Sequence, residues 1–205
     1  MGEIMKEDSA WKKHLHCIDG IWYARIKPET RGVAISKRMA VVIRAALTQN
    51  EKMNPRIPPG EITNERERTY LAYNCHRLAH ELRGLPSDDL DKMSQFQEYV
   101  YAEILRLVKD SKNFCGLDTL ESQLMTTTLP VVVHIARDMN NHPLHSFVVL
   151  GMDENRQFVC FDKQGALYLP FHVLNLKKII EDYNRNNYAI IVPDSTGQLV
   201  ETLKT

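Results

Sequence analysis

The pattern of hydrophobic and polar positions changes character near residue 129. Before that point, apolar residues recur at spacings of three and four, which predicts helices over residues 36–48, 74–84, 87–108 and 117–125. After it, short β-branched and aromatic runs predict strands over residues 129–136, 145–151, 156–162 and 188–192. Helices followed by a sheet favour an α+β fold in which N-terminal helices pack on a C-terminal antiparallel sheet.

The remaining segments give weaker patterns. Residues 1–19 have apolar spacing compatible with a short helix, and residues 21–26 are expected to form a strand. Prolines and a glycine indicate a loop over residues 49–62. A last helix is expected at residues 174–184 and a frayed tail at residues 193–205. We assign residues 1–205 to a single domain, since the chain has an ordinary length for one.

Composition and charge narrow the function only slightly. The chain has 26 basic and 26 acidic residues, and this zero net charge gives no indication of nucleic-acid binding. Its four cysteines are widely spaced without a CxxC pair, which excludes a disulfide scaffold, and Cys17, Cys115 and Cys160 are expected in the core. No apolar run approaches the ~20 residues of a membrane span, and the N-terminus lacks the apolar segment of a signal peptide. We expect a cytoplasmic chain where it is made, with export by a signal-peptide-independent route left open.

The first candidate catalytic residue lies in residues 74–84, a short amphipathic stretch with a cysteine in its first turn. Asn74 is a favourable N-cap, and Ala79 and Leu82 share one face of the predicted helix. The positive end of the helix macrodipole lowers the pKa of a nearby thiol and so favours the reactive thiolate. Cys75 is therefore a candidate nucleophile, and a small buried core cysteine is the structural alternative.

A histidine and an aspartate lie at matching places on two successive predicted strands. His145 begins one strand and Asp162 ends the next, with a four-residue turn at residues 153–156 between the strands. If Met152 pairs with Gln157 across that turn, Phe147 lies opposite Asp162. Side chains alternate with a period of two, so His145 and Asp162 would then be diagonal neighbours on one face. A slip of one residue would place them on opposite faces.

Cys75, His145 and Asp162 together predict a catalytic triad. The imidazole would take the thiol proton and return it to the leaving group, and the carboxylate would orient the ring. Backbone amides at the helix start, including that of Cys75, could stabilise the oxyanion. We expect a thiol-dependent hydrolase that cleaves an amide or isopeptide bond of a protein or peptide, without a cofactor. The alternatives are a non-catalytic protein-binding domain on the same fold and a metal protein that uses Cys75, His76 and His80.

The order and setting of these residues resemble papain-like cysteine hydrolases. Residues 144–150 and 161–165 are similar to the His and Asp strands of bacterial effector cysteine peptidases and effector glutamine deamidases. Asn74 and Cys75, with Ala79 four residues later, are similar to the catalytic helix of ovarian-tumour-type deubiquitinases, which have an aspartate where this chain has Ala72. The resemblance covers residues 73–84 and 130–192 and leaves residues 1–60 unassigned. It implies a papain-like fold, with Cys75 as nucleophile, His145 as general base and acid, and Asp162 as the orienting carboxylate.

Two positions depart from these family patterns. The Asp strand there typically reads Phe-Asp-Pro-Asn-x-Gly, whereas Lys163 follows Asp162 in this chain. Thr69 stands where papain-type enzymes have a glutamine six positions before the nucleophile, so a second oxyanion donor is unassigned. The candidates for that donor are Asn64, Gln49 and Asn74. Peptidase and protein-glutamine deamidase both fit the sequence, because both reactions pass through a thioester that water hydrolyses.

Overall fold

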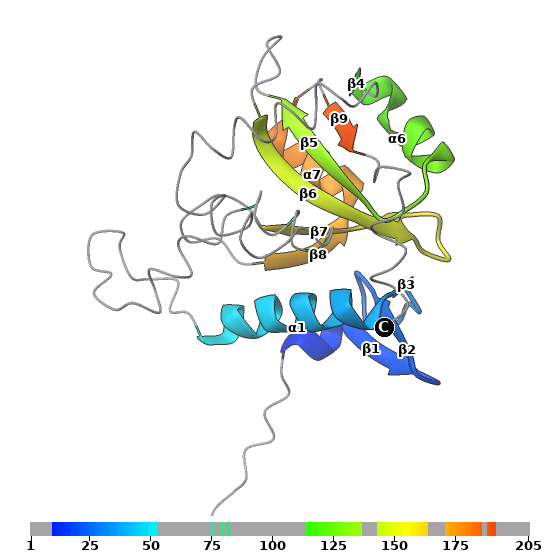
Figure 1. The fold of residues 1–205 in the computed structure, drawn as a ribbon, viewed down its shortest axis with the longest axis vertical. Helices are drawn as coiled ribbons and strands as arrows, with labels where there is room; N and C mark the ends of the chain where they lie inside the picture. Colours follow the sequence, from blue (N-terminus) through cyan, green and yellow to red (C-terminus); the bar gives the residue numbers. More distant parts are fainter. Residues whose placement is uncertain are drawn as a thin grey trace, which may run out of the picture.

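The computed structural model describes residues 10–52, 75, 79, 82, 114–136, 143–163, 171–185 and 188–191. Within these residues the chain is a mixed α+β structure with two antiparallel sheets, three α-helices described over their length, and further helical positions at residues 75, 79 and 82. Figure 1 shows the N-terminal elements as one layer and the larger sheet with its helices as the other part of the molecule. The helix expected at residues 87–108 and the tail at residues 193–205 lie outside the described residues.

A small sheet begins the described chain, where the sequence led us to expect a short helix. The elements are a 3-10 helix, η1 (Ala10–Lys13), and the strands β1 (Leu15–Ile18), β2 (Ile21–Ala24) and β3 (Val33–Ile35), paired in the order β1-β2-β3. Asp19 and Gly20 join β1 to β2 with φ angles of 49° and 81°. A two-residue Asp-Gly loop with positive φ at both positions is a type I′ hairpin turn. The helical expectation for residues 15–18 was wrong because this turn makes the segment a strand.

Helix α1 (Lys37–Lys52) follows the small sheet. It begins where the sequence predicts, because the Ser36 hydroxyl accepts a hydrogen bond from the backbone N–H of Met39 at 3.2 Å. The helix continues past Thr48, so the loop predicted from residue 49 starts later than expected. Residues 53–62 of that loop lie outside the described residues.

The larger sheet has six strands in the order β4-β9-β5-β6-β7-β8, and every neighbouring pair is antiparallel. The predicted strands appear as β5 (Val131–Ala136), β6 (Pro143–Met152), β7 (Phe158–Lys163) and β9 (Tyr188–Ile191). The pattern missed two short strands, β4 (Phe114–Cys115) and β8 (Phe171–Asn175). Helix α6 (Leu117–Thr126) matches its prediction. Helix α7 (Leu176–Tyr183) starts late because Asn175 ends β8 and caps the helix, accepting from the Lys178 N–H at 2.9 Å.

Alternating side chains of the larger sheet enter two cores. Val132, Val148 and Phe161 belong to a core shared with the small sheet and α1. Val133, Phe147 and Cys160 belong to a second core with residues of α6 and α7. Figure 1 shows α1 and the small sheet on one side of the larger sheet. The expected arrangement of helices on an antiparallel sheet is therefore present, but one side also carries a second sheet that was not expected.

Gly151 in β6 packs directly against Val33 of the small sheet. A Cβ atom there would lie 2.3 Å from Cγ1 of Val33 in β3. We expect Gly151→Ala to lower the free energy of unfolding by about 2 kcal/mol, because overpacking of a filled core costs energy. Urea unfolding of Gly151→Ala, Val33→Ala and the double variant tests this, and the double variant should recover part of the loss. An additive double variant would contradict the steric explanation.

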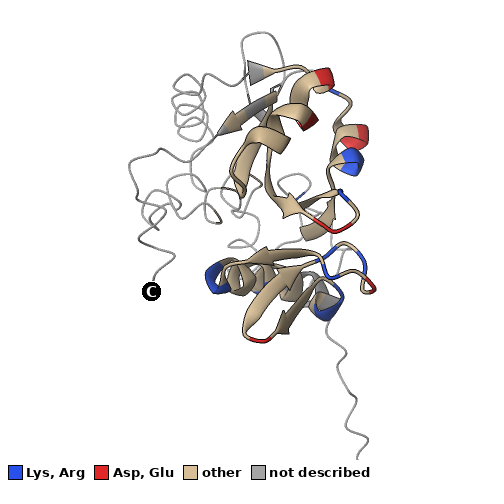
Figure 2. Cartoon of the chain, turned by 90° about the vertical axis from the view of Figure 1, so that its right-hand side faces the viewer, with Lys and Arg blue, Asp and Glu red and all other residues tan. Residues whose placement is uncertain are grey.

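A charged contact also joins the two sheets. Glu154, in the turn between β6 and β7, accepts hydrogen bonds from the backbone N–H groups of Arg31 at 2.7 Å and Gly32 at 3.1 Å. A hydrogen bond from its own backbone and then those from Arg31 and Gly32 lower the pKa of Glu154. Figure 2 shows this acidic turn beside the basic loop between β2 and β3. The turn that follows the His145 strand is thus held at a fixed place on the N-terminal layer.

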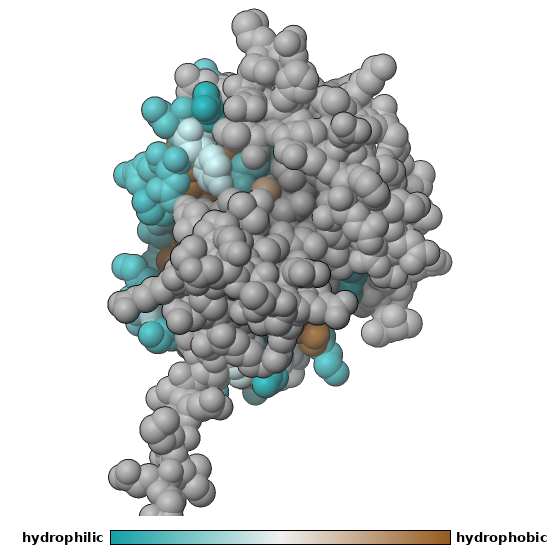
Figure 3. Space-filling view, turned by 90° about the vertical axis from the view of Figure 1, so that its left-hand side faces the viewer, coloured by the Kyte–Doolittle hydropathy of each residue, from teal (hydrophilic) through white to brown (hydrophobic). Residues whose placement is uncertain are grey.

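Polar residues predominate among the described residues that are visible in one surface view (Figure 3). In Figure 3 the coloured part of the surface is mostly hydrophilic and carries small, separate hydrophobic spots. The exposed large hydrophobic residues of the described chain include Ile18 and Ile21, which flank the type I′ turn. No helix in the described ranges has both the length and the apolar character required to cross a membrane.

Candidate active site

The cysteine predicted as nucleophile lies on a helical segment that packs against the larger sheet. Cys75, Ala79 and Leu82 all have helical conformation and are buried. Residues at spacings of four and three share one helix face, and Ala79 and Leu82 enter the core formed with α1 and the small sheet. Cys75 keeps 6% of its surface exposed. Cys75 is therefore nearly buried, on the same side of its helical turn as two residues that pack in this core.

The hairpin that carries His145 and Asp162 has the expected strand register at the site, although the strand pairing beside its turn differs from the expectation. Beside the turn, Met152 pairs with Phe158, one residue later than the expected partner Gln157. A β-bulge between Val149 and Gly151 then shifts the register by one residue, so that Val148 pairs with Phe161. Continuing this pairing places Phe147 opposite Asp162, as predicted. Without the bulge, the shifted turn would place His145 and Asp162 on opposite faces.

His145 and Asp162 form a buried hydrogen-bonded ion pair. Nε2 of His145 lies 2.5 Å from Oδ1 of Asp162, and the two residues are 1% and 0% exposed. The other carboxylate oxygen, Oδ2, is buried and has no hydrogen-bond partner among the described residues. The carboxylate thus directs its interaction to a single ring nitrogen. That contact leaves Nδ1 of His145 as the nitrogen available to the thiol.

Cys75 completes the cluster. Burial by itself lowers the pKa of His145, but Coulombic attraction to Cys75 and hydrogen bonds with Asp162 and Cys75 outweigh it and raise the pKa from 6.5 to about 9. A raised imidazole pKa next to a thiol favours proton transfer from sulfur to nitrogen. The structure therefore brings the three predicted residues together, in an arrangement that can hold a thiolate–imidazolium pair.

An aromatic residue outside the predicted triad covers the imidazole. The ring of Tyr183, at the end of α7, stacks on the His145 ring with centroids 4.2 Å apart and planes at 16°. Phe147 contributes a second, more distant stack at 6.3 Å. These rings limit rotation of the imidazole and favour its charged form, because an aromatic face attracts a cation. Tyr183 lies within the last helix predicted from the sequence, at residues 174–184, and no local signal linked it to His145.

Lys163 is a second residue that the sequence did not identify as part of the site. It follows Asp162 at the end of β7 and is fully buried. Burial lowers its pKa to about 8, and Coulombic attraction to Cys75 and Asp162 opposes that decrease. The available signal was the departure from the family pattern at this position, a lysine in a buried strand.

One further histidine and the three other cysteines lie outside the proposed triad. His134 is buried in β5, and its Nδ1 hydrogen-bonds the Ser146 hydroxyl on β6. Cys115 and Cys160 are buried as expected, and burial raises the pKa of both thiols. The expectation for Cys17 was wrong, because this residue occupies an exposed position of β1.

Two further predictions concerned a metal site at Cys75 and the second oxyanion donor. In the described ranges, no cluster of three or more His, Cys, Asp or Glu residues could hold a metal ion. His76 and His80, proposed as ligands with Cys75, lie outside those ranges. So do the candidate oxyanion donors Asn64 and Asn74, together with Thr69, whereas Gln49 lies in α1. Comparison of the chain with protein-family models, with curated proteins and with solved structures finds no match.

Proposed function

We propose that this protein is a thiol-dependent hydrolase that attacks an amide or isopeptide carbonyl of a protein substrate, on a papain-like fold. The observation that carries the proposal is the buried chain of contacts from Cys75 through His145 to Asp162. Groups with perturbed pKa values that converge on a nucleophile are typical of active sites. We expect the substrate to be met in the cytoplasm, either of the producing cell or after signal-peptide-independent export.

Each residue of the chain has a chemical role in this proposal. The Cys75 thiolate attacks the carbonyl carbon and forms a C–S bond, and the oxygen takes the negative charge. The His145 imidazolium gives its proton to the leaving nitrogen as the C–N bond breaks, which leaves a thioester and an amine. Water then attacks the thioester, its proton passes to His145, and the carboxylic acid leaves while the thiolate is restored. Asp162 stabilises the imidazolium and fixes the ring orientation throughout.

Peptidase and glutamine deamidase activities share these steps and differ in the leaving amine. A peptidase releases a new amino terminus, whereas a deamidase releases ammonia and leaves the chain intact. Incubating the protein with a library of proteome-derived peptides, followed by mass spectrometry, distinguishes the two outcomes. New termini indicate a peptidase, and conversion of glutamine to glutamate in uncut peptides indicates a deamidase.

A non-catalytic binding domain is the second candidate. A binding surface gains little from a thiol, an imidazole and a carboxylate that are nearly fully buried together, because burying charged groups costs free energy. The buried cluster therefore favours the hydrolase. An acyl-enzyme experiment separates the two candidates: after brief exposure to p-nitrophenyl acetate and acid quenching, intact-mass and peptide analysis should find one acetyl group on Cys75. Acetylation of Cys75 no faster than Cys17 would favour the binding domain.

Selective alkylation gives a substrate-independent prediction. At pH 6.5 we expect iodoacetamide to modify Cys75 first, then the exposed Cys17, and the buried Cys115 and Cys160 last. An ordinary exposed thiol has a pKa of about 8.5 and is mostly protonated at this pH, whereas a thiol paired with imidazolium is ionised. Burial raises the pKa of Cys115 and Cys160 and slows both further. Time-resolved peptide mapping measures the four rates, and a Cys75 rate equal to the Cys17 rate would argue against an ion pair.

A further inference from the structure

Charge balance in the proposed site calls for a second cation. In the reactive form, the Cys75 thiolate and the Asp162 carboxylate supply two negative charges, and the His145 imidazolium supplies one positive charge. This trio leaves one negative charge in excess in a region where His145 and Asp162 are almost completely buried. An unbalanced buried charge is strongly disfavoured, and the usual response is uptake of a proton. Protonation of the sulfur would then remove the nucleophile.

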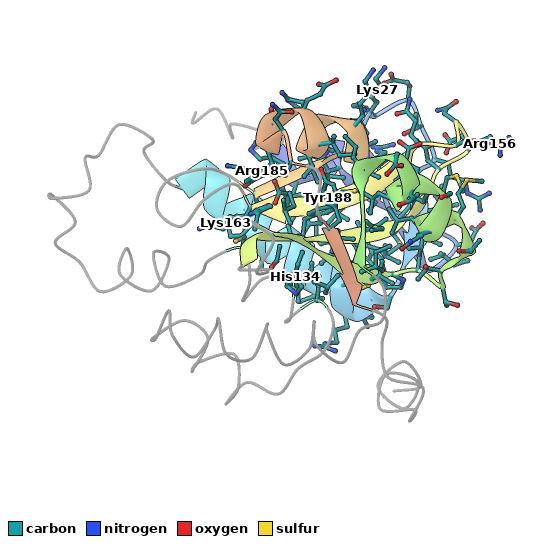
Figure 4. All side chains as sticks on the ribbon, turned by 90° about the horizontal axis from the view of Figure 1, so that it is seen from above. Lys27, His134, Arg156, Lys163, Arg185 and Tyr188 are labelled. Atoms are coloured by element: carbon teal, nitrogen blue, oxygen red, sulfur yellow. The ribbon has the colours of Figure 1, made fainter. Side chains whose placement is uncertain are left out.

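Lys163 is placed to supply the missing charge. It follows Asp162 directly on β7 and is 0% exposed. Because side chains alternate along a strand, Lys163 shares a face with Phe161, in the same core as Ala79 and Leu82 of the cysteine-bearing segment. Its Nζ lies 5.8 Å from the centre of the Phe171 ring, the residue opposite it on β8. Figure 4 shows Lys163 at one end of the sheet and Arg156, in the β6–β7 turn, at the other.

We propose that Lys163 is a positioning residue that acts through Cys75, balancing the buried negative charge so that the sulfur stays ionised at neutral pH. This inference rests on the proposed hydrolase function, since it concerns the nucleophile of that reaction. It is specific to this chain, because the families that the sequence resembles typically have a proline at this position. The ammonium need not contact substrate to have this effect.

The charged groups around Lys163 stabilise its protonated, positively charged form. Coulombic attraction to both Cys75 and Asp162 opposes the effect of burial and holds its pKa at about 8, so the ammonium persists at neutral pH. On the same side of the sheet, the ring of Phe171 offers its face to the cation. His172, opposite Asp162 on β8, has a pKa lowered by burial and adds no strong positive charge. The coupling is mutual: if the thiolate favours the ammonium, the ammonium favours the thiolate to the same extent.

The test is the pH dependence of Cys75 alkylation in three variants. Lys163→Met keeps the approximate length and removes the charge, whereas Lys163→Arg keeps the charge. Lys177→Met removes an exposed lysine of α7 as a control. In the wild type we expect the rate of iodoacetamide modification to reach half its maximum below about pH 7. Lys163→Met should move this midpoint up by about one pH unit or more, which approaches a tenfold loss of thiolate at pH values well below both midpoints. Lys163→Arg and Lys177→Met should leave it within a few tenths of a unit.

The outcomes separate this inference from the proposed function. A low wild-type midpoint that Lys163→Met leaves unchanged overturns the role of Lys163 and leaves the hydrolase standing. An ordinary midpoint near ~8.5 in both proteins overturns both proposals. If Lys163→Met does not fold, the reciprocal measurement is available in Cys75→Ala. There the ¹³Cε signal of Lys163 should titrate at a lower pH than in the wild type, and an unchanged titration overturns the inference.

Discussion

Replacing Cys75 with serine should abolish acyl-enzyme formation and lower the hydrolysis of a small activated ester by about 10⁴-fold or more. A serine hydroxyl is a far weaker acid than a thiol, so His145 cannot hold it as an anion in the resting enzyme. Burst and steady-state release of p-nitrophenol from p-nitrophenyl acetate measure the effect. The protein should still fold, because the change alters one atom in a residue that is 6% exposed.

The matched control for this variant is Cys17→Ser. Cys17 is an exposed residue with no part in the proposed chemistry, so its replacement should leave the ester rate unchanged. A Cys75→Ser variant that keeps a tenth or more of the wild-type rate would rule out Cys75 as the nucleophile. Loss of activity in Cys17→Ser would instead indicate that the reaction depends on the Cys17 thiol.

Asp162→Asn should lower the acylation rate at pH 7 by about 10³-fold or more, because the imidazolium loses its carboxylate partner and the ring can adopt the wrong tautomer. It should also lower the free energy of unfolding at pH 7 by about 3 kcal/mol, the scale expected when one partner of a buried ion pair is lost. Ester kinetics and urea unfolding measure the two effects. Glu121→Gln, which removes an exposed carboxylate of α6, should change neither.

The stability difference between wild type and Asp162→Asn should depend on pH in a defined direction. The pKa of His145 is raised from 6.5 to about 9 in the folded protein, partly by Asp162. Such a group contributes stability that is complete below the unfolded pKa of 6.5 and is lost as pH rises through 9. The difference should therefore be largest at pH 6 to 7 and shrink toward pH 10. A difference that grows with pH would contradict an imidazolium paired with this carboxylate.

The sequence predicted the strands and helices that have strong periodic patterns. Helix α6 and strands β5, β6, β7 and β9 follow from apolar spacing and β-branched runs, because those residues fill the two cores. Strand β4 has only two residues, too few for a pattern, and β8 was missed because its end overlaps the helix predicted from residue 174. The β1–β2 hairpin could have been found, because Asp19 and Gly20 form a recognisable turn between two short apolar runs.

In the candidate site too, some features could be predicted from the sequence and others could not. Strand positions predicted that His145 and Asp162 are neighbours, and they are, but through a bulge that compensates for a turn placed one residue away from the expected position. Gly151 at the bulge is a weak signal, because a glycine inside a strand often marks a bulge. The compensating shift of one residue also depends on how β6 fits both β7 and the small sheet, which local spacing does not predict. The partners Tyr183 and Lys163 come from α7 and the buried end of β7. Their proximity to the triad results from tertiary packing and has no signature in local spacing.

The most direct test of the central claim is the protonation state of His145, observed by ¹⁵N NMR of its imidazole ring. A thiolate–imidazolium pair predicts that both ring nitrogens of wild-type His145 carry protons at pH 7.5 and that the ring titrates near pH 9. Cys75→Ser removes the largest of the effects that raise this pKa, so the ring should titrate at least about one unit lower in that variant. A neutral ring in the wild type at pH 7.5, or the same titration in both proteins, would contradict the account.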